Sequence, residues 1–192
     1  GMNDIRSIQK SVSIIRKFKI PYALLHCTNI YPTPPKLVRL EAMLELKKKF
    51  KDSIIGLSDH TETIYTALGA ISLGASIVEK HFTDNKKSSG PDMKASLDPT
   101  DLKNLIEGSH TIYSAMKGKK MALKEEKKTI AFAFASVAST RKIFKGERLN
   151  ANNIFPIRPG TGFYKVKDYK YLIGKKAKKN IETNTQIKKS DI

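Results

Sequence analysis

Two short apolar runs that each end in a histidine constrain the fold of this chain most strongly. Residues 54–60 read IIGLSDH and residues 76–81 read SIVEKH. Both runs are rich in β-branched residues, which is typical of buried strands. The segment between them has the pattern of a helix, which predicts a strand–helix–strand unit with parallel strands and a right-handed crossover. His60 and His81 would then lie at the C-terminal edge of one sheet, where α/β proteins carry their functional sites.

The neighbouring segments extend this alternation of helices and strands. Hydrophobic periodicity predicts helices at 4–19 and 37–50 and a buried strand at 22–28. A further helix is expected to begin at Asp98, an N-cap residue followed by proline, and to end near Gly118. Such βα alternation predicts a parallel sheet covered by helices. Because the chain opens in a helical pattern with no preceding strand, we expect it to begin just after a strand of a larger α/β protein.

The pattern changes after residue 117. Residues 118–128 are charged and weakly apolar, which is typical of a linker, and residues 130–137 alternate small and large side chains, which predicts a strand. Turn-forming residues then become frequent. We therefore predict a domain at 1–117, a linker at 118–128 and a small β domain at 129–192.

The predicted small domain contains an internal repeat. Residues 143–154 and 181–192 carry apolar side chains at identical offsets. Gly146 aligns with Asn184, and these two residue types tolerate left-handed backbone best. The repeat predicts two related turn units, with three equivalent pairs: Ile143 and Ile181, Leu149 and Ile187, and Ile154 and Ile192.

Composition limits the classes of protein to consider. Hydrophobic residues make up 40% of the 192, enough for a packed core, but no apolar stretch approaches the ~20 residues that span a bilayer. A single cysteine, Cys27, excludes an internal disulfide and suits a reducing compartment, so we expect a cytoplasmic protein without a membrane partner. The net charge is +18, but the lysines are spread along the chain. This favours a solvated surface over nucleic-acid binding, although the field would also suit a phosphate-bearing substrate.

The paired histidines suggest a metal site. Two imidazoles at neighbouring strand ends can bind a divalent ion such as Mn²⁺, Fe²⁺ or Zn²⁺, and a structural role for each is the alternative. Asp59 and Glu79 flank them and should point differently because side chains alternate along a strand. Glu79 lies within a predicted strand, where an unpartnered buried carboxylate would be costly, and this favours a polar site.

Other polar residues are expected near the same edge. Asn29 ends the first predicted strand, and Ser58 shares a strand face with His60. Both side chains suit phosphate or carboxylate contacts, with helix capping as the alternative role. In the last domain, Arg158 is followed by a proline, and two glycines lie close by in the sequence. This pattern indicates either a surface turn or a rigid loop that presents the guanidinium to an anion or an amide.

Several strings of this sequence resemble the sialic acid synthase family, which includes N-acetylneuraminate and legionaminate synthases. They agree in order and spacing over essentially the whole chain, and the last part is similar to the antifreeze-like, or SAF, domain. The strings are LHCTNIYPTP at 25–34, IGLSDHT at 55–61, EKHFT at 79–83, SGPD at 89–92, FAFASV at 132–137 and RPG at 158–160.

The resemblance implies an α/β fold: the last three strands of a (β/α)8 TIM barrel, followed by a small SAF β domain. It also implies condensation of phosphoenolpyruvate with an N-acetylmannosamine-type sugar to a nonulosonate, with release of phosphate and with Mn²⁺ or another divalent metal. The family's first five barrel strands have no counterpart here, so we expect the chain alone to be weakly active and a chain carrying those strands to be a partner. The alternative is a non-catalytic sugar-binding or assembly module.

The resemblance also assigns roles to particular residues. His60 and His81 match the metal ligands of the family. Together with Glu79 they also match its catalytic residues, and Glu79 would orient a water molecule or the sugar. The other matches bind substrates: Asn29 and Ser58 face phosphoenolpyruvate, Tyr31 and Asp92 lie near the sugar, Arg158 reaches the sugar site of the partner in a domain-swapped homodimer, and Phe132 or Phe134 lies against the acetyl group.

Overall fold

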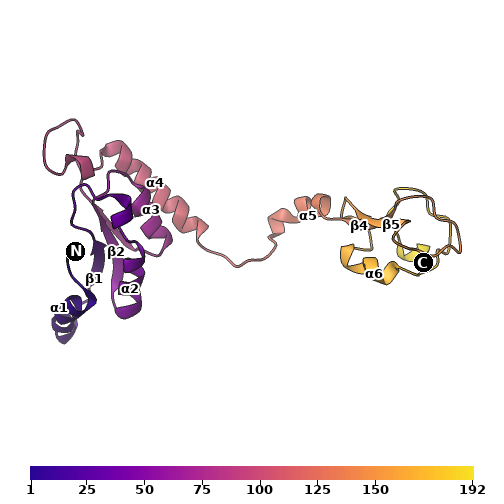
Figure 1. Cartoon of the computed structure of the whole chain (residues 1–192), viewed down its shortest axis with the longest axis horizontal. Helices are drawn as coiled ribbons and strands as arrows, with labels where there is room; N and C mark the ends of the chain where they lie inside the picture. Colours follow the sequence, from indigo (N-terminus) through magenta and orange to yellow (C-terminus); the bar gives the residue numbers. More distant parts are fainter. The chain divides into compact units, whose positions relative to one another are not determined.

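The computed structural model describes residues 1–192, which form two compact units, Gly1–Gly118 and Lys119–Ile192 (Figure 1). The N-terminal unit contains a parallel sheet of three strands in the order β1-β2-β3. These strands are β1 (Ala23–Cys27), β2 (Ile54–Asp59) and β3 (Ile77–Lys80). The predicted strand–helix–strand unit is therefore confirmed. The prediction that both of its strands are buried is wrong for β3, because β3, like β1, is an edge strand of this sheet.

Helices flank the three strands in the same unit. They are α1 (Ile5–Lys17), α2 (Glu41–Lys49), α3 (Tyr65–Ser72) and α4 (Pro99–Ala115). Helices α2 and α3 pack against the sheet, and α4 packs against α3 (Figure 1). The helix predicted at 37–50 begins later, because Arg39 adopts a left-handed φ of 55° that separates a 3-10 turn at Pro35–Leu37 from α2.

The start of α4 follows its predicted capping pattern. The Asp98 side chain accepts a hydrogen bond of 2.8 Å from the backbone N–H of Asp101, and Pro99 occupies the first helical position. The helix ends at Ala115, three residues before Gly118, whose φ of 137° is open to glycine alone. No helix of the structure combines the length and the apolar character needed to cross a bilayer.

The core of the N-terminal unit is in two parts. The larger part lies where α1 and α2 cover the sheet, and the smaller lies between α3 and α4. The larger part is built around Val12, Met43, Phe50 and Leu57, and the smaller around Ala67, Leu97 and Leu105.

The C-terminal unit contains one antiparallel strand pair and short helical segments. Its elements are a 3-10 turn at Lys124–Glu126, α5 (Lys127–Ala133), β4 (Ser136–Ser139), β5 (Ile154–Ile157), a 3-10 turn at Val166–Asp168, α6 (Tyr169–Leu172) and a 3-10 turn at Lys189–Asp191. The charged segment that we expected to link the domains is thus partly helical.

The strand predicted at 130–137 is wrong over its first half. Residues up to Ala133 belong to α5, and the N–H of Phe134 closes its last turn on the Ile130 carbonyl at 3.1 Å. Alanine has the highest helix propensity, so an alternation of Ala with Phe suits a helix as well as a strand. Phe132 and Phe134 are 70% and 63% exposed, so the alternating side chains do not form the buried face that would favour a strand over a helix.

The internal repeat is confirmed by the packing of the C-terminal unit. Ile143 and Ile181 form an antiparallel bridge through two backbone hydrogen bonds of 2.8 and 2.9 Å. Gly146 and Asn184 both adopt left-handed backbone, with φ of 84° and 55°. The apolar positions of the repeat line one core: Ile143, Leu149, Ile154, Ile181 and Ile187 are buried, and Ile192 packs against them.

Candidate functional site

The ends of β2 and β3 place two histidine rings side by side. The ring centroids of His60 and His81 lie 5.2 Å apart, and the ring of Tyr31 lies 4.1 Å from the first and 5.7 Å from the second. His60 is 6% exposed, whereas the His81 side chain is partly open to solvent. The two imidazoles therefore converge at the C-terminal edge of the sheet, beside an aromatic ring rather than among aliphatic side chains.

The hydrogen bond of His60 fixes which ring nitrogen is free. Its Nδ1 lies 3.0 Å from the Thr28 carbonyl oxygen. A carbonyl oxygen only accepts, so Nδ1 carries the proton and donates it. Nε2 is therefore the nitrogen that this hydrogen bond leaves free, and in a neutral ring it is the unprotonated one, as in metal-binding histidines whose other nitrogen is held by a backbone carbonyl.

His81 lies beside a carboxylate from the following loop. Its Nδ1 is 3.9 Å from Oδ2 of Asp92. Backbone hydrogen bonds of 2.8 and 2.9 Å hold Leu97 against His81 and Thr83, and they return the loop to the end of β3. Asp92, which the resemblance places near the sugar, is therefore a neighbour of the histidine pair.

Ser58 and Glu79 lie two residues before His60 and His81, so strand alternation places them on the same face as the histidines. The expectation that Glu79 points differently from the histidines is therefore wrong. The two residues are register partners in β2 and β3, and the Ser58 hydroxyl donates a 2.7 Å hydrogen bond to Glu79 Oε1. Ser58 is buried, but Glu79 is exposed. The concern about a buried carboxylate at Glu79 does not apply, because β3 is an edge strand.

The loop after β1 joins the same edge. Asn29 is exposed, and its Oδ1 lies 3.7 Å from the Cys27 sulfur, which in turn lies 3.9 Å from Nδ1 of His60. The backbone N–H of Thr33 donates a 2.9 Å hydrogen bond to the carbonyl of His60, which ties this loop to the histidine. Asn29 and Tyr31 thus approach the site from one side.

Sequence reasoning missed a buried ion pair at the same strand ends. Lys80 Nζ lies 3.0 Å from Asp59 Oδ2, and these side chains are 3% and 1% exposed. Burial lowers the pKa of Lys80, and the charge of Asp59 opposes this shift. Asp59 was noted only as a neighbour of His60. The available signal was a lysine in a strand, one residue before His81, just as Asp59 comes one residue before His60.

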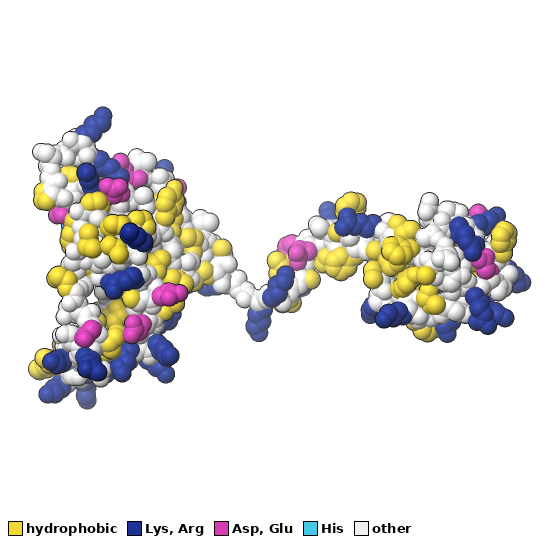
Figure 2. Space-filling model, in the orientation of Figure 1, with side chains coloured by type: hydrophobic (Ala, Val, Ile, Leu, Met, Phe, Trp, Pro, Cys, Tyr) yellow, Lys and Arg dark blue, Asp and Glu magenta, His cyan; other side chains and the backbone are white.

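The remaining predicted residues belong to the C-terminal unit. Arg158 is exposed at the end of β5 and lines a cavity of about 530 Å³ together with Gln186 and Lys188. The Gln186 amide donates a 3.0 Å hydrogen bond to the carbonyl of Pro159 and so holds the loop next to Arg158. Figure 2 shows basic side chains spread over the visible faces of both units.

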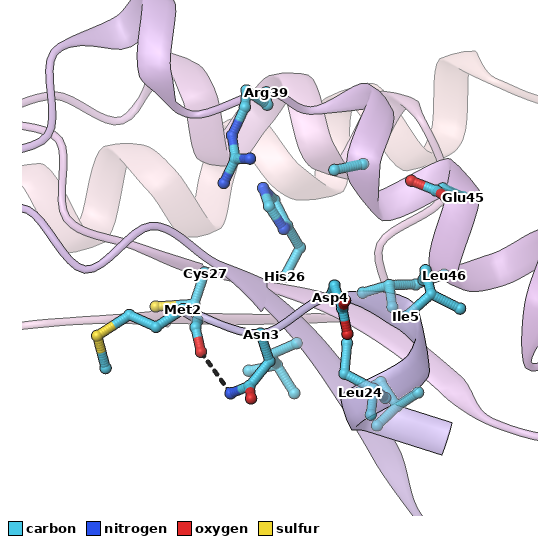
Figure 3. A pocket seen from close by; sticks show the side chains of 14 residues that line it. Met2, Asn3, Asp4, Ile5, Leu24, His26, Cys27, Arg39, Glu45 and Leu46 are labelled. Carbon is cyan, nitrogen blue, oxygen red and sulfur yellow. Dashed lines mark hydrogen bonds between the residues drawn. The ribbon is translucent and has the colours of Figure 1, made fainter. Parts of the chain in front are cut away.

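A second cavity of about 530 Å³ lies along β1 (Figure 3). Its lining includes Leu24 and His26 from the strand, Arg39 from the following loop and residues 1–5. Burial lowers the pKa of His26, whose Nε2 lies 2.7 Å from the Val38 carbonyl. None of the predicted site residues lines this cavity, and His26 is accounted for as a core histidine.

The donor set at the strand ends suits a metal ion held by few protein ligands. No group of three or more His, Cys, Asp or Glu side chains is arranged to hold a metal ion. The fit therefore rests on His60, whose Nε2 is free, and on the adjacent His81. Two imidazoles with open positions are compatible with several divalent ions and with direct substrate contact.

The comparisons with known proteins match both units. The model of the NeuB family matches residues 1–121, and the model of the SAF domain matches residues 134–192. An N,N'-diacetyllegionaminic acid synthase of Campylobacter jejuni is 39% identical, with 98% of this chain and 57% of that protein aligned. A pseudaminic acid synthase of the same species is 35% identical over 100% of this chain and 55% of its own length.

Solved structures agree with these relatives. The N-acetylneuraminic acid synthetase of Leptospira borgpetersenii is 34% identical, with a TM-score of 0.62 over 68% of this chain and 46% of that one. The spore coat polysaccharide biosynthesis protein SpsE of Bacillus subtilis is 28% identical, with a TM-score of 0.57 over 98% of this chain and 58% of that one. The chain spans a little over half the length of the curated synthases above. On its sequence and its fold, the chain belongs to the NeuB family of sialic acid synthases and carries a SAF domain.

Proposed function

We propose that this chain forms the metal-binding part of a synthase that condenses phosphoenolpyruvate with an N-acetylmannosamine-type sugar, giving a nonulosonate and phosphate. The observation that carries this proposal is the convergence of His60 and His81, whose ring centroids lie 5.2 Å apart, with Nδ1 of His60 held by the Thr28 carbonyl and Nε2 left free by that bond. Relatives named as legionaminic and pseudaminic acid synthases support the class of product.

The two histidines would hold the metal, for which Mn²⁺ is our first expectation. When bound there, a divalent cation supplies Lewis acidity to a carbonyl oxygen. The role of the protein is to keep both rings in place: the Thr28 carbonyl fixes His60, and the Tyr31 ring limits the movement of both. Asp92 would orient His81 or a sugar hydroxyl, since its carboxylate lies beside that ring.

The polar residues before the histidines would bind the charged substrate. The Asn29 amide is a donor suited to a phosphate or a carboxylate, and the Ser58 hydroxyl would donate to such a group only by giving up its hydrogen bond to Glu79. Ser58 holds the Glu79 carboxylate at 2.7 Å, so that Glu79 faces the same side of the sheet as His81 and can orient a water or the sugar. A net charge of +18 favours the approach of a substrate that carries both phosphate and carboxylate.

We further propose that β1, β2 and β3 are the last three strands of a (β/α)8 barrel. A TIM barrel closes with eight parallel strands, and both outer strands of this sheet lack a neighbour. The other strands of the barrel would correspond to the part of the longer relatives that does not align with this chain. In a domain-swapped dimer, Arg158 would reach the sugar of the partner subunit, for which its exposure in the C-terminal unit leaves it free.

The test is phosphate release from phosphoenolpyruvate and N-acetylmannosamine with Mn²⁺, with and without a chain that carries the N-terminal strands of a relative. We expect weak release by the chain alone and strong release by the pair. His60→Ala or His81→Ala should abolish it, whereas His110→Ala, which removes an exposed histidine of α4, should not.

The other outcomes are equally informative. Full turnover by the chain alone would contradict the incomplete barrel. A stable complex of the two chains without any turnover would favour a non-catalytic sugar-binding or assembly module, the second candidate that the open sheet edges allow.

A further inference from the structure

We propose, building on the metal role proposed above, that the buried Asp59–Lys80 ion pair positions the two histidines and thereby sets the metal affinity. Asp59 directly precedes His60, and Lys80 directly precedes His81. The two residues of the pair are register partners, the last of β2 and β3. The ion pair thus joins the two strands at the point where each delivers its histidine.

The pair lies on the opposite face of the sheet from the histidines. Side chains alternate along a strand, so Asp59 and Lys80 point away from the face that carries His60 and His81. The Thr66 hydroxyl of α3 donates a 2.7 Å hydrogen bond to Asp59, which places the pair under that helix. Asp59 and Lys80 therefore act on the histidines through the backbone, without touching a ligand bound between the rings.

The hydrogen bonds of the pair also fix the turn that follows His60. The Lys80 ammonium has three acceptors: Asp59 Oδ2 at 3.0 Å, the Thr61 carbonyl at 2.8 Å and the Thr63 carbonyl at 3.1 Å. The backbone N–H of Thr61 in turn donates to Asp59 Oδ1 at 3.1 Å. Residues on both sides of His60 are consequently bound to the end of β3.

Stability alone is a weak reason for such a pair. The desolvation of two buried charges offsets their attraction, and apolar replacements of buried ion pairs are often as stable. What an apolar pair cannot supply is the directional bonding of Lys80 to the turn at Thr61 and Thr63. We infer that the pair serves the geometry of the histidines, where a tolerance of about 0.5 Å separates a working site from a loose one.

The test uses the full chain with Lys80→Met and with the double variant Asp59→Leu/Lys80→Met. The double variant leaves no unpaired buried charge, so it should fold even where Lys80→Met does not. Two controls match the perturbation. Lys86→Met breaks the ion pair of Lys86 with Asp101, which does not join the strands, and Leu105→Ala lowers stability through the core between α3 and α4.

The first measurement is the nuclear Overhauser effect between the ring protons of His60 and His81 in the metal-free chain. The second is Mn²⁺ affinity, followed by the electron paramagnetic resonance signal of the free ion. We expect the ring-to-ring effect to be lost in the double variant and retained in both controls. Mn²⁺ binding should weaken by about 10–100-fold in the double variant, the usual cost of losing a residue that orients metal ligands.

Each outcome decides the matter. A folded double variant that keeps the ring-to-ring effect and the wild-type Mn²⁺ affinity overturns the inference and leaves the proposed function standing. The inference also fails if Leu105→Ala loses the effect equally. If the wild-type chain binds no Mn²⁺, the metal role fails, and the ring-to-ring effect alone then decides whether the ion pair positions the histidines.

Discussion

Equivalent positions of the internal repeat should contribute equally to the free energy of unfolding of the C-terminal unit. The two single substitutions Leu149→Ala and Ile187→Ala, compared with each other, test this. Both side chains are fully buried in the single core of the C-terminal unit. Each substitution removes three carbon atoms from that core. At about 0.8 kcal/mol for each buried methylene, the transfer term is about 2.4 kcal/mol. The cavity left behind raises the expected cost to about 3–5 kcal/mol.

This cost is large for a unit of this size. A folded unit of about 70 residues is stable by about 4–10 kcal/mol, so either substitution should remove a large part of its stability. The N-terminal unit has separate cores and should keep its own unfolding midpoint. A matched control is Phe144→Ala, which removes a large apolar side chain that is 58% exposed and should cost less than about 1 kcal/mol.

The assay is urea unfolding followed by methyl resonances in two-dimensional NMR, because the chain has no tryptophan to report on either unit. Ile154 reports on the C-terminal core and Leu57 on the N-terminal core. Costs below about 1 kcal/mol for either core substitution would refute the packing argument. Unequal costs for Leu149 and Ile187, differing by more than about 2 kcal/mol, would refute the equivalence of the two repeat units.

Three further outcomes follow from local contacts. The Arg141 guanidinium, with help from backbone and amide donors, lowers the pKa of Glu147 to about 2. The resulting stability is present above pH 4.5 and lost as pH falls toward 2, so wild type should lose more stability over that window than Glu147→Gln in acid urea titrations. Asp98→Ala should cost about 1 kcal/mol by removing the N-cap of α4, measured by thermal unfolding. Gly146→Ala should cost about 1–2 kcal/mol through its positive φ, and Gly146→Asn less, because Asn184 occupies the equivalent turn; equal costs in denaturant would contradict this.

The strand ends could be predicted because short β-branched runs give parallel strands a strong local pattern, even where, as in β3, the strand is not buried. The runs before His60 and His81 are continuous and β-branched, and parallel strands bring their C-terminal ends to one edge. The repeat could be found because equal offsets, such as those of Leu149 and Ile187, need no knowledge of the fold. In both cases, the information lies within a short stretch of sequence.

Two of the features that were missed depend on neighbours distant in sequence, and the third depends on competing local preferences. Whether Glu79 is buried depends on a strand beside β3, and the local pattern carries no sign of one. The helical state of residues 130–133 arises from alanine propensity that competes with an equally good strand pattern. The partner of Lys80 could only be named once the register of β2 and β3 was known.

The same register explains why an ion pair, rather than any polar contact, suits this position. A slip of β3 by one residue would exchange the two faces of the strand. Glu79 would then face Asp59 in place of Lys80, and two buried carboxylates side by side repel each other. The slip would also carry His81 away from His60. The charges of Asp59 and Lys80 therefore disfavour this slipped register, in which the two histidines no longer meet, and that selectivity is lost if both are replaced by apolar residues.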